Sequence, residues 1–383
     1  MTPIDLKAGW EVFEQSTDFT VGLEEEFAIL DPLTLDLAPR YEQLRAAAAA
    51  DAELDPALAG ELISSEIEIV SGRGENLQAA AAAQAGHRRG LFALAHAEGV
   101  ALGATGTHPF ADYRAQQIID TEHYRRVASG LQYVARRNNT FSLHVHVGVN
   151  GADRAVKVCD RLRPVLPALL AISANSPFLD GEDAGLASAR TQTFTRSFPR
   201  CGIPDPFGSW QQFSEYIDFL VETRSIVEYT QVWWSVRPHL AFGTVEVRIC
   251  DVQASASESD ALSALIVACV AQAMREVDEG RPAVEVPGRL IEENLWRAIR
   301  YGLDGELLDL EQANPYPAGE AIERLLAWTA EVRRELGINP VLQGPNGAQR
   351  QRALLESGLS LQEAYVETVA ATRDSYAASY ERA

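Results

Sequence analysis

Acidic residues inside apolar segments are the first candidates for chemistry. Residues 21–30 read VGLEEEFAIL, so three glutamates interrupt an otherwise apolar run. In a β-strand, successive side chains point to opposite faces, which puts Glu24 and Glu26 on one face, about 7 Å apart, and Glu25 on the other. Two neighbouring carboxylates on an apolar strand repel each other and favour a bound cation. A solvated edge strand is the alternative, and we expect Glu25→Gln to have little effect.

A second acidic segment covers residues 61–71, which read ELISSEIEIVS. Its alternation of apolar and polar residues predicts another strand, with Glu66 and Glu68 on the same face. Acids at the centre of two apolar strands would lie close together if the strands belong to one sheet. This segment therefore strengthens the prediction of a cation site.

Two histidines mark a third predicted strand, over residues 139–150. His144 and His146 lie on one face of it, and the valines between and after them lie on the other. A single histidine on a strand is usually structural. Two histidines on the same strand face make metal or phosphate binding as good an interpretation as a structural role.

Residues 231–237 and 243–252 predict a hairpin whose second strand carries Glu246 and Arg248 on one face. A buried ion pair with a purely structural role is one interpretation, although such pairs contribute little net stability. The functional interpretation is a metal-binding carboxylate beside a guanidinium that binds substrate. Arg237, on the facing strand, adds a second cation.

The order of the predicted elements indicates an α+β fold rather than a regular βαβ alternation. Strands are concentrated in the first two thirds of the chain, and helices dominate the end. We expect one domain over residues 1–383, with a sheet-bearing catalytic core at 1–305 and a helical part at 306–383 packed on it.

Composition limits the possible partners. The chain has 383 residues, with 33 Lys and Arg against 54 Asp and Glu, so its formal net charge is −21. A surface of this charge repels nucleic acids and anionic membranes. The sequence shows neither a signal peptide nor an apolar stretch of membrane length, so we expect a cytoplasmic protein without nucleic-acid or membrane partners.

Several nucleotide-binding and hydrolase motifs are missing from the sequence. It contains neither the P-loop pattern nor a Gly-x-Ser-x-Gly elbow, and Gly103-Ala-Thr-Gly106 lacks the rest of the dinucleotide fingerprint. Any nucleotide would therefore be held by metal ions, arginines and loop amides.

Taken together and in order, these segments resemble the glutamate–cysteine ligase type 2 family, and within it the carboxylate–amine ligase subgroup. The resemblance extends from about residue 20 to about residue 305 and is carried by residues 20–27, 67–70, 106–110, 144–148, 190–199 and 234–251. It implies the fold of the glutamine synthetase catalytic domain, an antiparallel sheet curved into a saddle or funnel and backed by helices.

The resemblance also implies an activity: ATP-dependent ligation of the glutamate γ-carboxylate to an amine through an acyl phosphate, with cysteine as the default amine. Mg²⁺ is the implied metal, and a histidine ligand makes Mn²⁺ a second possibility. The implied metal ligands are Glu24, Glu26, Glu68, His146 and Glu246. The implied catalytic residues are Arg248 and Arg237, and the implied substrate or ATP contacts are Arg190, Arg300, His144, Thr107 and His108. Glu66 matches no position of the family pattern and is left out.

Two other functions fit the same residues. The His-x-His pair with scattered acids could form a zinc-dependent amidohydrolase, which would need no nucleotide. An arginine-lined pocket could also serve a non-catalytic protein that binds an acidic metabolite and releases no ADP. Small-molecule substrates are the expected partners, and a homo-oligomer is possible.

Overall fold

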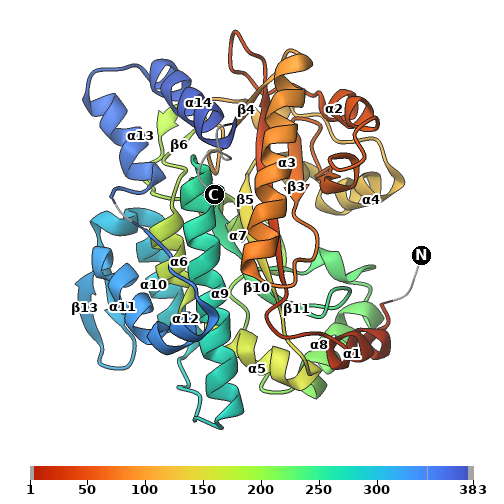
Figure 1. Ribbon diagram of the computed structural model, residues 1–383, viewed down its shortest axis with the longest axis vertical. Coiled ribbons are helices and arrows are strands. Elements are labelled where there is room, and N and C mark those ends of the chain that lie inside the picture. The colour runs from red at the N-terminus through yellow and green to blue at the C-terminus, as the bar shows by residue number, and fades with distance from the viewer. Residues whose placement is uncertain (1–3, 343, 378–383) are drawn as a thin grey trace.

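The computed structural model describes residues 4–342 and 344–377, and Figure 1 shows the arrangement of their helices and strands. The main sheet has seven strands in the order β10-β11-β5-β1-β3-β2, and β4 pairs with β1 beside this path. All of these pairings are antiparallel, and the sheet does not close into a barrel. Its strands are β1 (Val21–Leu30), β2 (Leu58–Ala59), β3 (Glu66–Val70), β4 (Ala101–Gly103), β5 (Ser142–Gly148), β10 (Val236–His239) and β11 (Thr244–Asp251).

Three short two-stranded sheets lie outside the main sheet. They are formed by β6 (Phe178–Leu179) with β7 (Glu182–Asp183), β8 (Cys201–Gly202) with β9 (Trp233–Trp234), and β12 (Glu306–Asp309) with β13 (Asn314–Pro317). The β12–β13 hairpin lies within residues 306–383, the part that we expected to be helical and that also carries α11 to α14. Here Asp309 accepts backbone hydrogen bonds from Glu311 and Gln312 and fixes the turn.

The α-helices are spread along the whole chain and become denser towards its end. They are α1 (Leu6–Glu14), α2 (Tyr41–Ala48), α3 (Leu77–Ala97), α4 (Glu122–Leu131), α5 (Ala152–Leu162), α6 (Leu166–Ser173), α7 (Ala189–Ser197), α8 (Trp210–Glu222), α9 (Ala256–Asp278), α10 (Gly288–Tyr301), α11 (Ala321–Trp328), α12 (Ala330–Leu336), α13 (Gly347–Glu356) and α14 (Leu361–Ala377). In the described ranges, no helix is long and apolar enough to cross a membrane.

Helices cover one face of the main sheet, which we call the back face. Helices α3 and α9 cross the sheet side by side in Figure 1, and α5 packs on α9 and on β10 and β11. The alternation of β5 and β11 sends Leu143, Val145, Val147, Val245 and Val247 into this core, where all five are fully buried. The residues that alternate with these on the same strands are polar, and their side chains point to the other face of the sheet. The predicted α+β fold with an antiparallel sheet backed by helices is confirmed.

The strand predicted over residues 61–71 is shorter in the structure, because β3 begins only at Glu66. Residues 61–65 form turns and an isolated bridge between Ile63 and Ile118 instead. This difference changes the direction in which Glu61 points, with consequences for the site described below.

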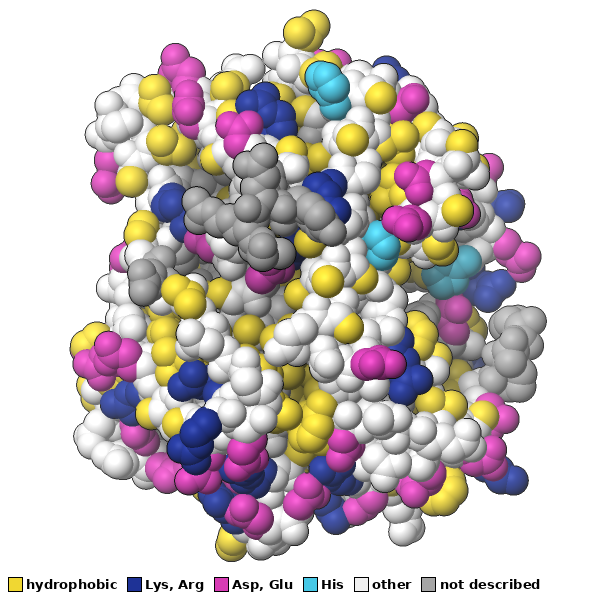
Figure 2. Space-filling view, in the orientation of Figure 1, with side chains coloured by type: hydrophobic (Ala, Val, Ile, Leu, Met, Phe, Trp, Pro, Cys, Tyr) yellow, Lys and Arg dark blue, Asp and Glu magenta, His cyan; other side chains and the backbone are white. Residues whose placement is uncertain are grey.

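The molecular surface in view mixes charges of both signs. Figure 2 shows acidic and basic side chains interspersed over this face, so the excess of acids is not gathered there into one patch. The face in view is thus neither a basic nor a uniformly acidic surface.

Candidate active site

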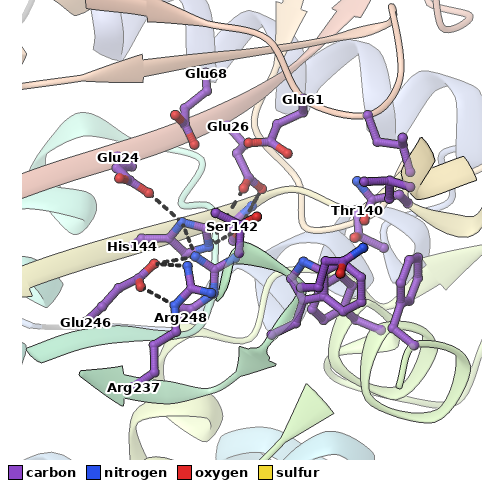
Figure 3. A pocket seen from close by; sticks show the side chains of 18 of the residues that line it. Glu24, Glu26, Glu61, Glu68, Thr140, Ser142, His144, Arg237, Glu246 and Arg248 are labelled. Atoms are coloured by element: carbon purple, nitrogen blue, oxygen red, sulfur yellow. Dashed lines mark hydrogen bonds and ion pairs between the residues drawn. The ribbon is translucent and has the colours of Figure 1, made fainter. Parts of the chain in front are cut away.

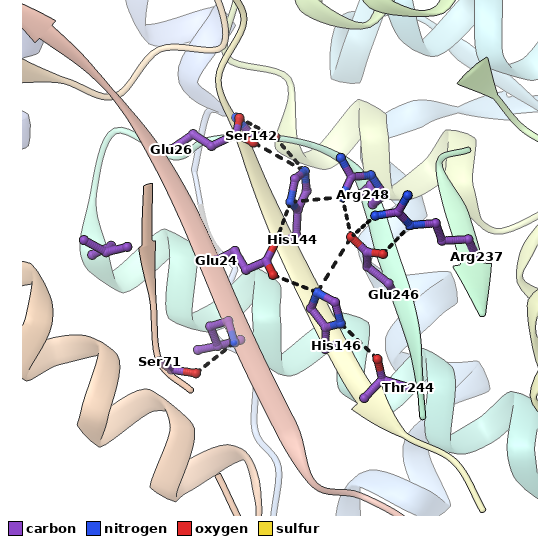
Figure 4. A network of polar contacts seen from close by, with 12 residues as sticks. Glu24, Glu26, Ser71, Ser142, His144, His146, Arg237, Thr244, Glu246 and Arg248 are labelled. Atoms are coloured by element: carbon purple, nitrogen blue, oxygen red, sulfur yellow. Dashed lines mark hydrogen bonds and ion pairs between the residues drawn. The ribbon is translucent and has the colours of Figure 1, made fainter. Parts of the chain in front are cut away.

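The register of the sheet brings the predicted site residues into one cluster. Glu24 on β1 is paired with His144 on β5, and Glu26 is paired with Glu68 on β3. On the other side of β5, Glu246 on β11 is paired with both His146 and Arg237. Because side chains alternate with a period of two, each strand contributes its polar residues to the same face. Figure 4 shows Glu24, His144, His146 and Glu246 pointing toward one another.

Hydrogen bonds connect the two histidines with the β1 carboxylates. Glu24 accepts at 2.8 Å from Nδ1 of His144 and lies 3.0 Å from Nε2 of His146. Ser142 donates its backbone N–H and its hydroxyl to Oε2 of Glu26, both at 2.5 Å. Burial alone would raise the pKa of Glu24, but His146 and then His144 hold it well below its ordinary value. The two histidines therefore favour the ionised form of Glu24, which is the form that can bind a cation.

Glu246 is bound by two guanidinium groups. It is 1% exposed, and both Arg237 and Arg248 donate to its carboxylate. Arg237 and then Arg248 lower its pKa well below the ordinary value despite its burial. The structure therefore holds Glu246 and Arg248 together as an ion pair, on the same strand face that the sequence predicted for them. Removing the charge of Glu246 would leave one buried and one partly buried guanidinium group without their counter-ion.

A β-bulge lies at Arg248. The β5–β11 register shifts between Val247 and Cys250, so β11 carries one extra residue there. Bulges bend a strand and re-aim side chains, and they occur frequently beside active sites. Here the backbone N–H of Arg248 binds Ser235 O at 2.8 Å, and its side chain reaches Glu246 and His144.

Three sets of side chains have the composition and spacing of metal sites. Within each set, one potential ligand atom of every residue lies within 4.8 Å of the others. The sets are Glu24, Glu68 and His144; Glu24, His146 and Glu246; and Glu26, Glu61 and Glu68. Carboxylate oxygens are the preferred protein ligands of Mg²⁺, and the sets with an imidazole also suit Mn²⁺. The donor chemistry therefore fits hard divalent cations.

The electrostatics of the third set support this interpretation. Burial, and next the charge of Glu26, raise the pKa of Glu61 to about 8. Burial, and next the charge of Glu24, raise the pKa of Glu68 well above its ordinary value. Ionising these carboxylates is unfavourable in the folded protein, and a bound divalent cation would remove that cost.

Glu61 is the site residue that the sequence analysis missed. A strand through residues 61–71 would place Glu61 on the face opposite Glu68, because seven positions separate them. The turns at residues 61–65 break that parity and bring Glu61 to the same side. The sequence signal was present, since Glu61 opens the acidic segment, but its direction depends on a local turn. Glu66, by contrast, is 1% exposed and belongs to none of the three sets.

A cavity of about 290 Å³ opens beside the carboxylates, and we call it the substrate cavity. Figure 3 shows Glu24, Glu26, Glu61 and Glu68 on one side of it, facing Arg237 and Arg248 on the other. Arg190, in the first turn of α7, also lines it and donates to the backbone carbonyls of Arg248 and Ile249. Nε of Arg190 and Nε of Arg248 are buried without a hydrogen-bond partner.

A second cavity, of about 470 Å³, meets the same cluster from the other end of the strands, and we call it the apolar cavity. Glu24 lines both cavities, and His146 lines the second. The apolar cavity is lined by the end of α1 and the residues after it, the start of β1, the end of β3 with Arg73, and the β10–β11 turn with Phe242. The carboxylate cluster therefore lies between an apolar and a strongly polar chamber.

Three predicted contacts lie away from both cavities. Thr107 donates to Phe178 O at 2.8 Å, and His108 is fully buried with Nε2 2.7 Å from Leu35 O. Burial lowers the pKa of His108 to about 4, so it is a neutral core histidine. Arg300, on α10, donates to Gly185 O. None of the three lines the substrate cavity or the apolar cavity. The structure thus places Thr107, His108 and Arg300 outside the pocket in which we expected them.

Comparison with known sequences defines the class of protein. The chain belongs to the glutamate–cysteine ligase family 2, whose pattern it matches over residues 20–374, further toward the C-terminus than the motifs alone indicated. It is therefore an ATP-dependent ligase. A relative in Rubrobacter xylanophilus, provisionally named glutamate–cysteine ligase 2-2, is 38% identical over 366 residues, covering 95% of this chain and 94% of that protein. A relative in Solibacter usitatus, with the provisional name glutamate–cysteine ligase 2, is 38% identical over 347 residues, covering 88% and 90%.

Solved structures share the fold at low sequence identity. The glutamate–cysteine ligase of Francisella tularensis, in complex with AMP, superposes with a TM-score of 0.63 at 11% identity, covering 95% of this chain and 91% of that one. A bifunctional glutathione synthetase from Pasteurella multocida gives a TM-score of 0.66 at 14% identity, covering 98% of this chain and 54% of that one. These similarities support the fold.

Proposed function

We propose that the protein joins the γ-carboxylate of glutamate to an amine at the expense of ATP, through an acyl-phosphate intermediate. The observation that carries this proposal is the cluster of three potential metal sets and two paired arginines, buried on one sheet face between two cavities. The relatives' names point to cysteine as the amine.

The two cavities suggest opposite directions of entry. The apolar cavity suits a nucleoside, because an adenine ring is largely apolar and can pack beside Phe242. The triphosphate would then point toward Glu24 and His146, where a divalent cation can bridge it to the protein. The substrate cavity, with its unpartnered arginine nitrogens, suits the carboxylate that receives the phosphoryl group.

The residues of the cluster have separate tasks in this reaction. When bound, divalent cations supply charge neutralisation for the phosphates and for the transferring phosphoryl group. Glu24, His146 and Glu246 would hold one cation, and Glu26, Glu61 and Glu68 another. Arg248 would bind the transferring phosphoryl group through its free Nε, and Arg190 the substrate's α-carboxylate. Arg237 is hydrogen-bonded to Glu246 and would keep the carboxylate of Glu246 in position.

The acyl phosphate makes the carboxyl carbon electrophilic. The amine nitrogen then forms a bond to this carbon, the carbon–oxygen bond to phosphate breaks, and phosphate leaves with the electron pair. Burial of the site limits competing attack by water.

The test is ADP formation with Mg²⁺, ATP and L-glutamate, with hydroxylamine added to trap the acyl phosphate as a γ-glutamyl hydroxamate. We expect ADP and hydroxamate in equal amounts. A zinc-dependent amidohydrolase would instead act without nucleotide and contain stoichiometric zinc. A metabolite-binding protein would bind glutamate but release no ADP. Either result would refute the proposal.

A further inference from the structure

One wall of the substrate cavity has a chemistry that the ligation of glutamate does not use. It consists of Leu62, Val127, Leu131, Phe194, Phe198 and Trp233, which we call the apolar wall. The rings of Phe194 and Phe198 are stacked with their centroids 4.8 Å apart, and Phe198 meets Trp233 edge-on at 5.9 Å. Leu62, Val127 and Trp233 also belong to one small hydrophobic cluster, so the wall is anchored rather than formed by loose side chains. A flat apolar group is what such a wall would contact.

The substrate cavity has too few free arginine groups to bind a second substrate carboxylate, that of an amino-acid acceptor. Among the described residues that line it, three are arginines. Arg237 is fully engaged, with Nε and one terminal nitrogen on Glu246 and the other on Val232 O. Of these three, only Arg190 and Arg248 keep a buried nitrogen without a partner. The proposed reaction already needs these two, for the α-carboxylate of glutamate and for the transferring phosphoryl group.

The remaining charge of the cavity is negative. Glu26, Glu61 and Glu68 line it, and His123 at its edge forms an ion pair with Glu228. With one divalent cation bound among them, the three carboxylates still carry more negative charge than the cation neutralises. They therefore attract an amine, which enters as an ammonium ion. An α-amino acid would also bring a carboxylate, and burying this charge near other carboxylates without a partner is costly.

We propose that the acceptor of this ligase is a primary amine with an apolar, aromatic body and no carboxylate, rather than an α-amino acid. The proposal rests on the proposed function and specifies its second substrate. The ammonium ion first loses one proton to solvent, which frees the electron pair on nitrogen. The amine nitrogen then forms the bond to the acyl carbon, phosphate departs with the electron pair of the broken carbon–oxygen bond, and the second proton lost by nitrogen is taken up by phosphate. The step needs no further reactant.

Matched pairs of amines test the two parts of the proposal separately. L-Cysteine against cysteamine, and L-phenylalanine against 2-phenylethylamine, differ only in the carboxylate. Ethylamine against 2-phenylethylamine differs only in the aromatic body. With L-glutamate and Mg–ATP, we expect kcat/KM to favour the amine without a carboxylate, and the aromatic amine, by at least about tenfold in each pair. Hydroxylamine serves as the reference nucleophile, because its hydroxamate reports the acyl phosphate itself.

A variant of the apolar wall completes the test. Phe198→Ala should lower the ratio of kcat/KM for 2-phenylethylamine to that for hydroxylamine by about tenfold or more. Phe219→Ala is the matched control, since Phe219 is 56% exposed on α8 and does not line the cavity, and it should leave the ratio unchanged.

The possible failures are distinguishable. Absence of hydroxamate would refute the proposed function and the acceptor with it. Hydroxamate formation together with a preference for L-cysteine over cysteamine, or for L-phenylalanine over 2-phenylethylamine, would overturn only the acceptor proposal. An equal loss of the ratio in Phe198→Ala and Phe219→Ala would also overturn it.

Discussion

The two faces of β1 treat the same residue type in opposite ways. On the back face, Glu25 is fully buried and receives hydrogen bonds from Arg88, Gln84 and Ser259. On the site face, Glu24 and Glu26 interact with histidines and a serine but with no arginine among the described ion pairs and hydrogen bonds. On the back face, the protein itself supplies a full positive charge to Glu25. On the site face, a bound cation could supply that charge to Glu24 and Glu26.

This difference shows how a structural carboxylate can be distinguished from one that binds a ligand. Burial would raise the pKa of Glu25, but the charge of Arg88 and the hydrogen bonds from Arg88, Ser259 and Gln84 together outweigh it and lower the pKa below the ordinary value. For Glu68, opposite Glu26, burial and the charge of Glu24 act in the same direction and raise the pKa. The back face is electrostatically complete, whereas Glu61 and Glu68 on the site face can ionise only at a cost, which a bound cation would remove.

The largest effect is expected on the site face, in Glu26→Gln. The amide oxygen can still accept from Ser142, so the fold should be retained, but the carboxylate charge needed by a divalent cation is lost. We expect kcat for ATP turnover to fall by at least about a thousandfold, or about 4 kcal/mol in activation free energy. Turnover assays with thermal melts would measure both properties. Wild-type turnover in this variant would remove Glu26 from the metal sites.

On the back face, Glu25→Gln should act mainly on stability. Arg88 is itself fully buried, with its other ion pair to Asp260 at 2.7 Å, so the change leaves a buried guanidinium without its main partner. We expect a loss of about 3–5 kcal/mol in unfolding free energy, measured by denaturant titration. This reverses our expectation from the sequence that Glu25→Gln has little effect. If the variant kept wild-type stability but lost turnover, the contrast between the two faces would be wrong.

A third prediction concerns pH and Mg²⁺. The folded-state pKa of Glu61 is about 8, above its ordinary value of 4.5, and that of Glu68 is also raised. Groups with a raised pKa contribute stability that is fully present below pH 4.5 and is lost as pH rises to about 8. The metal-free protein should therefore lose thermal stability between about pH 6 and about pH 9, and Mg²⁺ should raise the melting temperature more at the higher pH.

The control for this experiment is Glu61→Gln. It removes one of the groups with a raised pKa and should reduce the difference between the Mg²⁺ shifts at the two pH values. A Mg²⁺ shift that is larger at the lower pH would contradict the assignment of Glu61 and Glu68 to a cation site.

Period-two alternation made much of this site predictable from the sequence. It placed Glu24, His146 and Glu246 on one face of their strands, and the structure brings them together. It could not place Glu61, whose direction depends on the turns before β3, nor the bulge beside Arg248.

The partner of Glu25 was also beyond the sequence. Arg88 lies 63 positions away on α3, and Asp260 lies on α9, so only the packing of two helices on the sheet brings the three together. Family motifs carried Thr107, His108 and Arg300 into the predicted pocket, where the structure does not place them. Strand periodicity thus predicts faces, whereas contacts between distant elements require the fold.

The smallest predicted effect tests whether the C-terminal helix contributes to the back face. Tyr376, at the end of α14, is fully buried, donates to Gln253 O at 2.8 Å and lies 3.2 Å from Oε1 of Glu25. Its ring stacks on Phe92 and meets Phe27 edge-on, and the phenyl ring introduced by Tyr376→Phe could keep these contacts. Only the hydroxyl would be lost, which should cost about 1 kcal/mol because Glu25 retains its stronger donors.

Because the network around Glu25 lies behind the strand that carries Glu24 and Glu26, the same variant also measures how firmly that strand is held. We expect kcat and KM in Tyr376→Phe to stay within about twofold of wild type, since Arg88 still fixes Glu25. In the background of Glu25→Gln, however, Tyr376→Phe should cost less than it does alone, because one of the two acceptors has changed. A double-mutant cycle on unfolding free energy would measure this coupling. Strict additivity would show that Tyr376 stabilises α14 through Gln253 alone and takes no part in positioning the site.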